Sequence, residues 1–352
     1  NGLLDLRTLQ FTNGIQPQHY LTKTIPYDYE VATAKDELWV KDNITKICNN
    51  TEAHTNYFLG MLGYFMCGDA SLKQNFWYIR GQSANNGKSV IFEALMKIIA
   101  NLIVKLESNF FEINYGSRHK EIACWSGIRI AWVDELSQKQ QDETVFKELS
   151  NGTPQRFKVM FGEMDTQPIN FKVAIVSNYS PNINADKGIQ RRLNLLQFDS
   201  QFVKTQEDVD EKKCLFLVDE DFVNKLATTY KHALLGLIYK YSNEFCKTKN
   251  LPPYPEEWDN DKQEVIKEND KFVGWFEDTF ELDPNEDISK TDLETRIKEK
   301  FGNKPVRFRD ELKKMKLDKV ITYDSQLKKN GDRGFWKGLK LITENQAPPV
   351  YE

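Results

Sequence analysis

The spacing of apolar residues along the chain predicts several amphipathic helices. Residues 1–70 are predicted to be mostly helical. In the stretch KDELWVKDNITKICNN, apolar residues recur close to helical spacing at Leu38, Val40, Ile44 and Ile47. A further helix is predicted after Lys88, where the same spacing continues through Val90, Ile91, Ala94, Leu95, Ile98 and Ile99. Its single apolar face is suited to packing on a sheet.

Short runs of aromatic and β-branched residues predict buried strands between these helices. The runs are FWYI (76–79), IRIAWV (128–133) and KVAIV (172–176). Strands that alternate with helices along a chain indicate an α/β sheet domain. The predicted fold class is therefore α/β.

The last third of the chain has a different organisation. A helical stretch covers about 219–247, and the proline-rich LPPYPEEW (251–258) indicates a linker. A helix through Trp275 and Phe276 is predicted next, followed by two short amphipathic helices, KTDLETRIKEKFG and RFRDELKKM. The sequence VITYDSQLKKNGDRGFWKGLKLI then predicts two strands around an Asn-Gly-Asp-Arg-Gly turn. Helices followed by a basic hairpin resemble a winged helix. We expect four parts, at 1–70 (helical), 71–200 (sheet core), 201–255 (helical extension and linker) and 256–352 (winged-helix-like).

Composition is that of a globular protein of two or three domains, with 352 residues, 40% hydrophobic and 28% charged. The five cysteines form no CxxC pair, which favours a reducing compartment without a disulfide framework or a zinc cluster. The apolar run near 57–67 is shorter than the roughly 20 residues that span a bilayer. No signal peptide pattern opens the chain, which starts at Asn1 rather than Met. We expect a piece of a longer cytoplasmic protein, in the host cytoplasm if a virus encodes it.

Charge is distributed unevenly, although the net charge is only −4. Between positions 296 and 340 there are 15 Lys and Arg residues against 6 Asp and Glu residues. Such a basic segment on an acidic body is typical of a protein with a polyanionic partner. A solvated charged surface is the alternative interpretation.

The stretch GQSANNGKSV contains the pattern of a phosphate-binding loop. It lies between a predicted strand and a predicted helix, as that motif requires. Gly87 would allow close backbone approach, Lys88 would supply charge to the β- and γ-phosphates, and Ser89 would ligate Mg²⁺. Five residues instead of four separate Gly81 from Gly87. The nucleotide-binding residues predicted are Gly81, Gln82, Ser83, Ala84, Asn85, Asn86, Gly87, Lys88, Ser89 and Val90; the alternative is a structural glycine-rich turn.

Three further motifs follow the loop in the chain. The strand IRIAWV ends in Asp134, a predicted Mg²⁺ ligand, and Glu135, which is predicted to polarise the attacking water. Asn178 ends the strand KVAIVSN and is predicted to position that water, although Asn at a strand end is usually a turn residue. Arg191 and Arg192 precede another hydrophobic strand. They are predicted to include an arginine finger for a neighbour's site, with a solvated surface pair as the alternative.

In chain order, NNGKS, WVDEL, KELSNGTPQRFKVMF, VAIVSN and QRRLNLLQF resemble the motifs of the superfamily 3 helicases. The similarity is greatest to the poxvirus primase-helicase and phage or plasmid primase type. The stretch Lys147–Gly152, KELSNG, is similar to the family's KLTGGD-like segment but lacks its second Gly and its Asp. The resemblance covers roughly 35–200 well and the remainder in outline.

This resemblance implies an AAA+-like P-loop core that assembles as a hexameric or similar ring. ATP with Mg²⁺ would bind between subunits, and Arg191 is favoured over Arg192 as the finger. A hairpin within 156–172 would contact single-stranded DNA through Arg156, Lys158 and Lys172. The winged-helix-like part would add Arg307, Arg309, Lys313, Lys314, Lys328, Lys329 and Arg333. Contact with another protein is the alternative role of this part.

The function expected is that of an ATP-driven DNA helicase in viral or phage replication, acting on single-stranded or forked DNA. A primase or polymerase, in the same chain or another, is the expected partner. The alternative is a nucleotide-stabilised ring clamp that holds such a partner on DNA without processive unwinding. A P-loop kinase for small molecules is a weaker third hypothesis, because it leaves Asn178, Arg191 and the basic segment unexplained.

Overall fold

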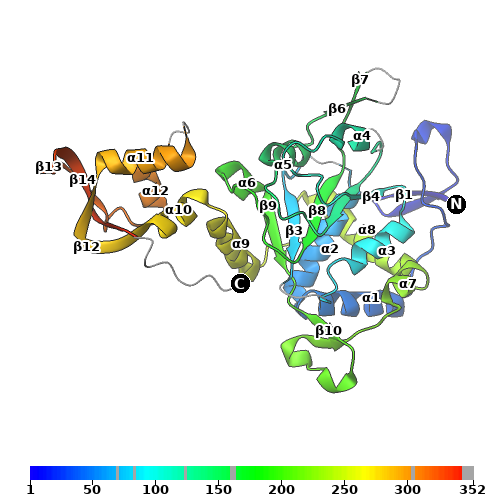
Figure 1. Ribbon diagram of the computed structural model, residues 1–352. Helices are drawn as coiled ribbons and strands as arrows, with labels where there is room; N and C mark the ends of the chain where they lie inside the picture. The colour runs from blue at the N-terminus through cyan, green and yellow to red at the C-terminus, as the bar shows by residue number, and fades with distance from the viewer. Residues whose placement is uncertain (69–70, 82–84, 123–124, 159–163, 303–305, 343–352) are drawn as a thin grey trace. The chain divides into compact units, whose positions relative to one another are not determined.

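The computed structural model describes residues 1–352 except 69–70, 82–84, 123–124, 159–163, 303–305 and 343–352. The chain forms two compact units, Asn1–Ile266 and Lys267–Glu352. The first contains a five-stranded parallel sheet with the strand order β4-β5-β8-β3-β9 (Figure 1). Its strands are β3 (Phe76–Arg80), β4 (Ile103–Leu106), β5 (Ile130–Asp134), β8 (Lys172–Ser177) and β9 (Leu193–Gln197). The predicted α/β fold class is confirmed for this unit.

Each face of the sheet is covered by its own hydrophobic core. In β3, Trp77 and Ile79 belong to one core, whereas Phe76 and Tyr78 belong to the other, as side-chain alternation requires. The first core is completed by α1 (Ala34–Ile47), α2 (Glu52–Met66), α3 (Val90–Ile98) and α8 (Lys231–Thr248). The second includes residues of α5 (Glu143–Ser150) and the adjacent residues Phe110 and Phe111. Both faces are buried, which explains why the strands read as continuous apolar runs.

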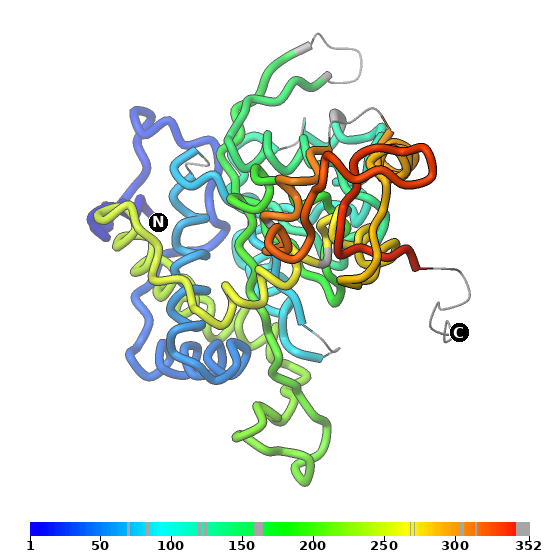
Figure 2. Tube along the Cα trace, turned by 90° about the vertical axis from the view of Figure 1, so that its left-hand side faces the viewer, coloured from blue at the N-terminus to red at the C-terminus, as the bar shows by residue number. Residues whose placement is uncertain are grey.

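Helix α2 lies inside the first core rather than on its surface. Every residue from Tyr57 to Met66 is buried. Helices α2 and α8 run side by side in both views (Figures 1 and 2). A Cβ at Gly63 would lie 2.6 Å from the backbone nitrogen of Ser242, so glycine is needed for the two backbones to approach this closely. Close packing here also brings the Sγ atoms of Cys67 and Cys246 to 3.5 Å, although 179 positions separate them.

The helical prediction is wrong for the first 33 residues. They form a hairpin of β1 (Gly2–Asp5) and β2 (Gln10–Asn13), then a short 3₁₀ turn, η1 (Pro17–His19). Apolar side chains of the hairpin and of the irregular backbone after it pack on the first core, at Leu4, Leu6, Ile25, Tyr27 and Tyr29. The apolar pattern of 1–33 thus reflects burial but not a helix.

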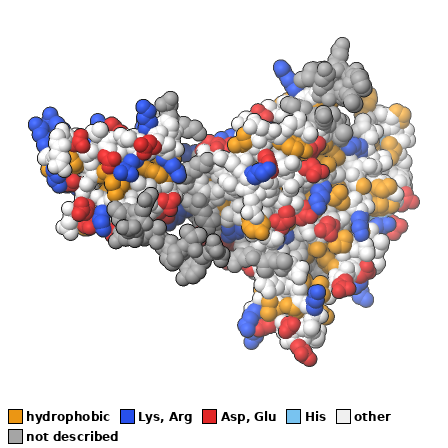
Figure 3. All heavy atoms as spheres, in the orientation of Figure 1, with side chains coloured by type: hydrophobic (Ala, Val, Ile, Leu, Met, Phe, Trp, Pro, Cys, Tyr) orange, Lys and Arg blue, Asp and Glu red, His pale blue; other side chains and the backbone are white. Residues whose placement is uncertain are grey.

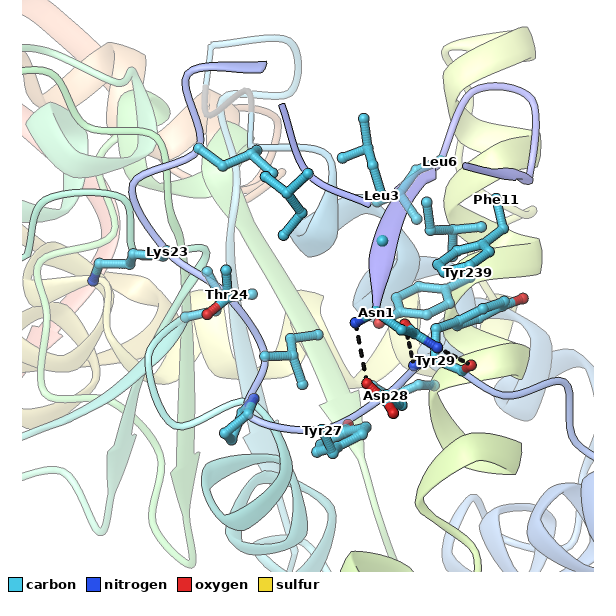
Figure 4. Close-up of a pocket in the computed structure, with 18 of the residues that line it drawn as sticks. Asn1, Leu3, Leu6, Phe11, Lys23, Thr24, Tyr27, Asp28, Tyr29 and Tyr239 are labelled. Atoms are coloured by element: carbon cyan, nitrogen blue, oxygen red, sulfur yellow. Dashed lines mark hydrogen bonds and ion pairs between the residues drawn. The ribbon is translucent and has the colours of Figure 1, made fainter. Parts of the chain in front are cut away.

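A cavity of about 520 Å³ lies beneath this N-terminal segment (Figure 4). The segment is held by Asn1, whose amino group is 3.1 Å from Asp28 and whose side chain exchanges hydrogen bonds with the backbone of Tyr29. None of the residues predicted to bind nucleotide, metal or DNA lines this cavity. It therefore lies apart from the predicted chemistry.

The first unit also contains shorter elements that decorate the sheet. They are α4 (Arg118–Ile122), α6 (Lys187–Arg192), α7 (Phe222–Ala227), the hairpin β6 (Gln155–Lys158)–β7 (Met164–Gln167), the parallel pair β10 (Gln201–Val203)–β11 (Leu215–Leu217), η2 (Gln206–Asp208) and η3 (Glu211–Lys213). The β6–β7 hairpin and the β10–β11 segment project from the body at opposite ends (Figures 1 and 2). The helical stretch predicted at 219–247 is present but divided into α7 and α8.

The second unit has an α-β-α-α-β-β order of elements. They are α10 (Lys271–Thr279), β12 (Phe280–Ser289), α11 (Lys290–Phe301), α12 (Phe308–Lys314), β13 (Thr322–Lys329) and β14 (Asp332–Leu341). The strands form an antiparallel sheet, β12-β14-β13, and the two short helices and the hairpin predicted from sequence are confirmed. Strand β12 was not predicted, because acidic residues and Pro284 interrupt its apolar alternation and a register shift separates Asp283 from Asp287.

Helix α9 (Glu256–Glu268) leads from the proline-rich stretch towards the second unit. The single long helix predicted through Trp275 is instead α9 and α10, divided where Asp270 caps the N-terminus of α10. Trp258 on α9 is 1% exposed, and its indole donates a hydrogen bond to the Gln197 carbonyl. The start of α9 is therefore part of the first core. Within the described part of the chain, no helix has both the length and the apolar character needed to cross a membrane.

Candidate active site

Three of the predicted motifs meet at one edge of the parallel sheet. Gly81 follows β3, Asp134 ends β5, and Asn178 follows β8. Strand β8 lies between β3 and β5, and all three run in the same direction. Their carboxyl ends therefore open at the same edge, where ligands of parallel α/β sheets bind.

The described part of the phosphate loop is tightly folded against the sheet. A Cβ at Gly81 would lie 2.7 Å from the backbone carbonyl oxygen of Phe198, so glycine is needed there. Asn86 is 2% exposed and donates a hydrogen bond to the Phe198 carbonyl at 3.3 Å. Gly87 has φ +74°, a left-handed conformation that favours glycine. Gln82, Ser83 and Ala84, which include the extra residue of the motif, lie outside the described residues.

Lys88 projects from this loop to the end of β8. Its Nζ atom donates hydrogen bonds to Oδ1 of Asn86 at 2.7 Å and to Oδ1 of Asn178 at 2.6 Å. The side chain is nearly enclosed, and burial lowers the pKa of Lys88, against the opposing effect of the carboxylates of Glu135 and Asp134. Ser89 directly precedes α3, whose N-terminus adds free backbone N–H groups to the site.

Glu135 is held by the end of strand β8. Its Oε1 accepts a hydrogen bond from Nδ2 of Asn178 at 2.6 Å, and its Oε2 accepts from the Asn178 backbone at 3.3 Å. The hydroxyl of Ser177 lies 3.4 Å from the same Oε2. Glu135 has φ +57°, a left-handed conformation that is uncommon for a residue with a side chain. Such strain concentrates at functional sites because packing must hold it in place.

Asp134 is paired with a cation that sequence reasoning missed. Lys105 on β4 approaches it to 2.7 Å between Nζ and Oδ2. The signal available in sequence is the single charge in the apolar strand IVKL. Arg80, the last residue of β3, was also missed; its guanidinium donates to Gln197 at 2.7 Å and to the Ser180 hydroxyl at 2.8 Å. Lys88, Arg80 and Lys105 thus place positive charge around the edge at which the motifs meet.

Arg191 and Arg192 are not brought to this edge. They precede β9, which pairs in parallel with β3 from Leu193 opposite Phe76, so they lie at the amino ends of the strands. Arg191 is exposed and donates a hydrogen bond to Gln74 at 3.0 Å. Arg192 is 8% exposed, and its guanidinium donates to the Gly188 carbonyl and to Oδ1 of Asn151, each at 2.8 Å. The bond to Asn151, which caps the C-terminus of α5, ties α6 to α5, so Arg192 has a structural role.

The predicted hairpin exists, but one of its predicted DNA contacts is wrong. Arg156 is exposed on β6, opposite Thr166. Lys158 is the last residue of β6, and its side chain is not among those that the structure describes. Lys172 is not on a hairpin arm. It begins the central strand β8, is 2% exposed, and its Nζ lies 4.4 Å from the centroid of the Tyr64 ring. A buried lysine under a ring does not reach a DNA backbone.

Basic side chains of the second unit are exposed, and some of them form ion pairs or contact aromatic rings. Arg307, Arg309, Lys313, Lys328, Lys329 and Arg333 are exposed. Lys329 is 2.5 Å from Asp287, and the guanidinium of Arg309 lies 5.3 Å from the Tyr323 ring. The side chain of Lys314 lies outside the described residues. Taken whole, 267–352 has 18 Lys and Arg residues and 18 Asp and Glu residues, and the two kinds are intermixed on the face in Figure 3. The positive charge of 296–340 is therefore offset by acidic residues elsewhere in the same unit.

Comparisons with known proteins found no matching family model and no matching curated protein. Among solved structures, the A form apo structure of the NrS-1 C-terminal region is similar, with a TM-score of 0.49 and 9% identity, over 90% of this chain and 78% of that chain. Another A form apo structure of that region gives 0.45 at 7% identity, over 89% and 77% of the two chains. A further apo structure gives 0.44 at 9%, over 90% and 78%. These similarities, with TM-scores below 0.5, do not indicate a function for this chain.

Proposed function

We propose that the first unit is a P-loop ATPase with an AAA+-like core and that the protein acts as a ring-forming DNA helicase of the superfamily 3 type. One observation carries this proposal. Three separate motifs form a single chain of contacts, in which the Asn178 amide accepts from Lys88 and donates to Glu135. A glycine-rich structural turn requires no such link to a distant acidic strand.

Each residue of this chain has a role that its chemistry supports. Lys88 and the backbone N–H groups at the start of α3 would bind the phosphates of ATP. Ser89 and Asp134 offer the oxygen ligands that Mg²⁺ prefers, and Mg²⁺ would neutralise charge on the phosphates. The Lys105 ammonium beside Asp134 supports a cation site at that carboxylate. Glu135 would accept a proton from the attacking water, and Asn178 would fix the direction in which Glu135 faces.

A ring would complete this site with a residue from the neighbouring subunit. Arg191 lies at the amino ends of the parallel strands, whereas its own subunit's phosphate loop lies at their carboxyl ends. It is therefore suited only to a site formed with another copy. Heterologous contacts of this kind generate a ring when the rotation between subunits closes. Arg191 rather than Arg192 would be the finger, because the Arg192 guanidinium is occupied within its own subunit.

DNA contact is proposed at two places. The β6–β7 hairpin would present Arg156, and Lys158 follows it on the same strand. The second unit has the α-β-α-α-β-β order of a winged helix, and exposed basic residues lie just before α12, at Arg307, and on the hairpin, at Lys328. Phosphate contacts of this kind position a protein on DNA without reading sequence.

The test is ATP hydrolysis with and without single-stranded DNA, together with unwinding of a forked duplex. Wild-type protein should hydrolyse ATP and unwind the fork, and Lys88→Ala should abolish both activities. Lys97→Ala is the matched control, because Lys97 is exposed on α3 and bonds only Asn224 among the described contacts. Absence of ATP hydrolysis by the wild type would refute the proposal.

A nucleotide-stabilised clamp is the second candidate function. It is favoured by the burial of Lys172 and by the zero net charge of the second unit, which leave few basic side chains to move DNA. Glu135→Gln separates the two candidates. A clamp would hold DNA as well as the wild type does and keep its partner working, whereas a helicase would lose unwinding.

A further inference from the structure

A cavity of about 360 Å³ adjoins the described part of the phosphate loop. Asn85, Gly87 and Val90 form one side of it. The other sides come from α1, from the projecting β10–β11 segment and from the first residue of α7. Its volume lies within the range of small-molecule pockets, roughly 300–1,000 Å³.

The β10–β11 segment is attached to the loop, so the cavity has a fixed position relative to the phosphates. The backbone N–H of Phe202 donates a hydrogen bond to the Asn85 carbonyl at 2.8 Å. A Cβ at Gly87 would lie 3.1 Å from Cε2 of Phe202 and 3.0 Å from Cγ1 of Ile47. Gly87 therefore gives the loop both its left-handed turn and its close contact with this aromatic wall.

Part of the cavity wall is apolar and aromatic, and polar side chains line the rest of it at half-buried or exposed positions. The rings of Phe202 and Phe216 lie with centroids 6.0 Å apart, and Nζ of Lys46 lies 5.9 Å from the Phe216 centroid. Phe216 is 4% exposed, whereas the polar residues Gln206 and Glu211 are exposed at the rim. A flat aromatic ligand fits such walls, because ring stacking and contact with apolar side chains need no hydrogen bonds.

We propose that this cavity binds the base of the nucleotide, with Phe202 and Phe216 as its aromatic wall. The proposal rests on the proposed function, because Lys88 and the loop must bind the phosphates. It assigns to the β10–β11 segment a role in substrate binding that no motif in the sequence indicates.

The nature of the cavity wall also predicts which nucleotides bind. A site rejects a wrong base strongly when that base leaves buried polar groups unpaired. Among the described residues lining this cavity, no polar side chain is fully buried. Stacking on a ring tolerates any base, so GTP should bind within about tenfold of ATP.

The test compares binding of AMP-PNP, GMP-PNP and inorganic tripolyphosphate, each with Mg²⁺, by calorimetry. Wild-type protein should bind AMP-PNP at least ~10-fold more tightly than tripolyphosphate, since only AMP-PNP has a base to stack. Phe202→Leu should weaken AMP-PNP binding by ~10-fold and leave tripolyphosphate binding unchanged. Leu215→Ala is the control, because Leu215 is on β11 beside Phe216 but does not line the cavity.

Photolabelling provides a readout that needs no variant. With 8-azido-ATP, the labelled peptides should come from 201–222 or from the part of α1 that lines the cavity, and tripolyphosphate should block the label. Labelling elsewhere, or equal loss of AMP-PNP and tripolyphosphate binding in Phe202→Leu, would overturn this inference and leave the proposed ATPase standing. If the wild type binds neither AMP-PNP nor tripolyphosphate, both proposals fail.

Discussion

The carboxamide of Asn178 contacts two oppositely charged groups at once. Its oxygen accepts a hydrogen bond from Lys88, and its nitrogen donates one to Glu135. Neither a carboxylate nor an aliphatic side chain could make both contacts, since the first lacks a donor and the second lacks both groups. At the scale of single residues, this amide couples the phosphate loop to the acidic strand.

Asn178→Ala tests that coupling. Without the amide, Glu135 loses its closest hydrogen bond and no longer faces the water in a fixed direction. We expect kcat for ATP to fall by about 100-fold, as for loss of a positioned general base. Nucleotide affinity should change by less than about fivefold, because the loop remains.

Rates from a coupled phosphate-release assay and affinities from calorimetry would check this. Asn182→Ala is the control, since Asn182 also follows β8 but bonds the backbone of Gln138. A variant Asn178→Ala with wild-type kcat would show that the amide has no part in hydrolysis.

Lys105 and Mg²⁺ should compete for Asp134. The ammonium is 2.7 Å from the carboxylate, but both side chains are partly exposed, so the pair contributes at most about 1 kcal/mol. Lys105→Ala should therefore lower the Mg²⁺ concentration for half-maximal hydrolysis, by up to about fivefold. Lys139→Ala, which removes a pair with Glu112, should leave it unchanged. A higher Mg²⁺ requirement in Lys105→Ala would mean that Lys105 assists the metal instead.

At the scale of elements, helix α9 depends on a stack between two rings. His54 of α2 lies 4.3 Å from Trp258 of α9, between centroids, and Nε2 of His54 lies 3.4 Å from Oε2 of Glu257. Burial lowers the pKa of His54, although the Glu257 and Asp199 carboxylates and a backbone contact with Cys48 act in the opposite direction. The folded protein therefore favours the neutral imidazole.

This shift makes the stability of the first unit sensitive to acid. The unfolded chain binds a proton at His54 near its ordinary pKa of about 6.5, and the folded chain binds it only at lower pH. The contribution of His54 to the free energy of unfolding is thus fully present above that value. It is lost as pH falls through that value towards the folded pKa.

Thermal melts between pH 7.5 and 5 would measure this loss. His54→Phe, which keeps a ring against Trp258, should show a smaller fall in Tm than the wild type. Burial also lowers the pKa of His232, so His232 contributes to the acid sensitivity with the same sign. The variant His232→Gln would measure that contribution separately from the one made by His54. An identical pH dependence in His54→Phe and wild type would contradict the prediction.

At the scale of the whole molecule, the position of Arg191 predicts that activity needs two subunits. Lys88→Ala and Arg191→Ala should each be inactive alone. In an equal mixture, about a quarter of the interfaces would combine an intact Lys88 with an intact Arg191 from the neighbour, if heterologous contacts close a ring. Hydrolysis should therefore return to about a quarter of the wild-type rate.

A mixture of Lys88→Ala with Asn178→Ala is the control for this experiment. Lys88 and Asn178 both belong to the subunit that holds the phosphate loop, so in this mixture no subunit has both residues intact. No interface therefore regains a complete site. Recovery in the first mixture and not in the second would support a finger from the neighbour. No recovery in the first mixture would exclude it.

Local sequence pattern was sufficient for four of the five sheet strands, but not for β4, and for the central motifs. Strands that are buried on both faces read as apolar runs, and chemical residues at their carboxyl ends follow directly, as at Asp134 and Asn178. The sequence pattern did not predict the structure of segments in which buried residues do not recur at a regular spacing. Residues 1–33 pack apolar side chains from a hairpin and an irregular backbone, and β12 has a polar, bulged middle.

The sequence by itself determined four of the five strands of the α/β core and the positions of Lys88, Glu135 and Asn178 just beyond strands of that core, because these depend on local spacing. The tertiary structure alone decided which groups meet across long separations. It brought Lys105 to Asp134, buried Lys172 and Arg192, and placed Phe202 and Phe216 beside Gly87. The physical reason is that strand order and register set such contacts, and neither is encoded in the neighbouring residues of the chain.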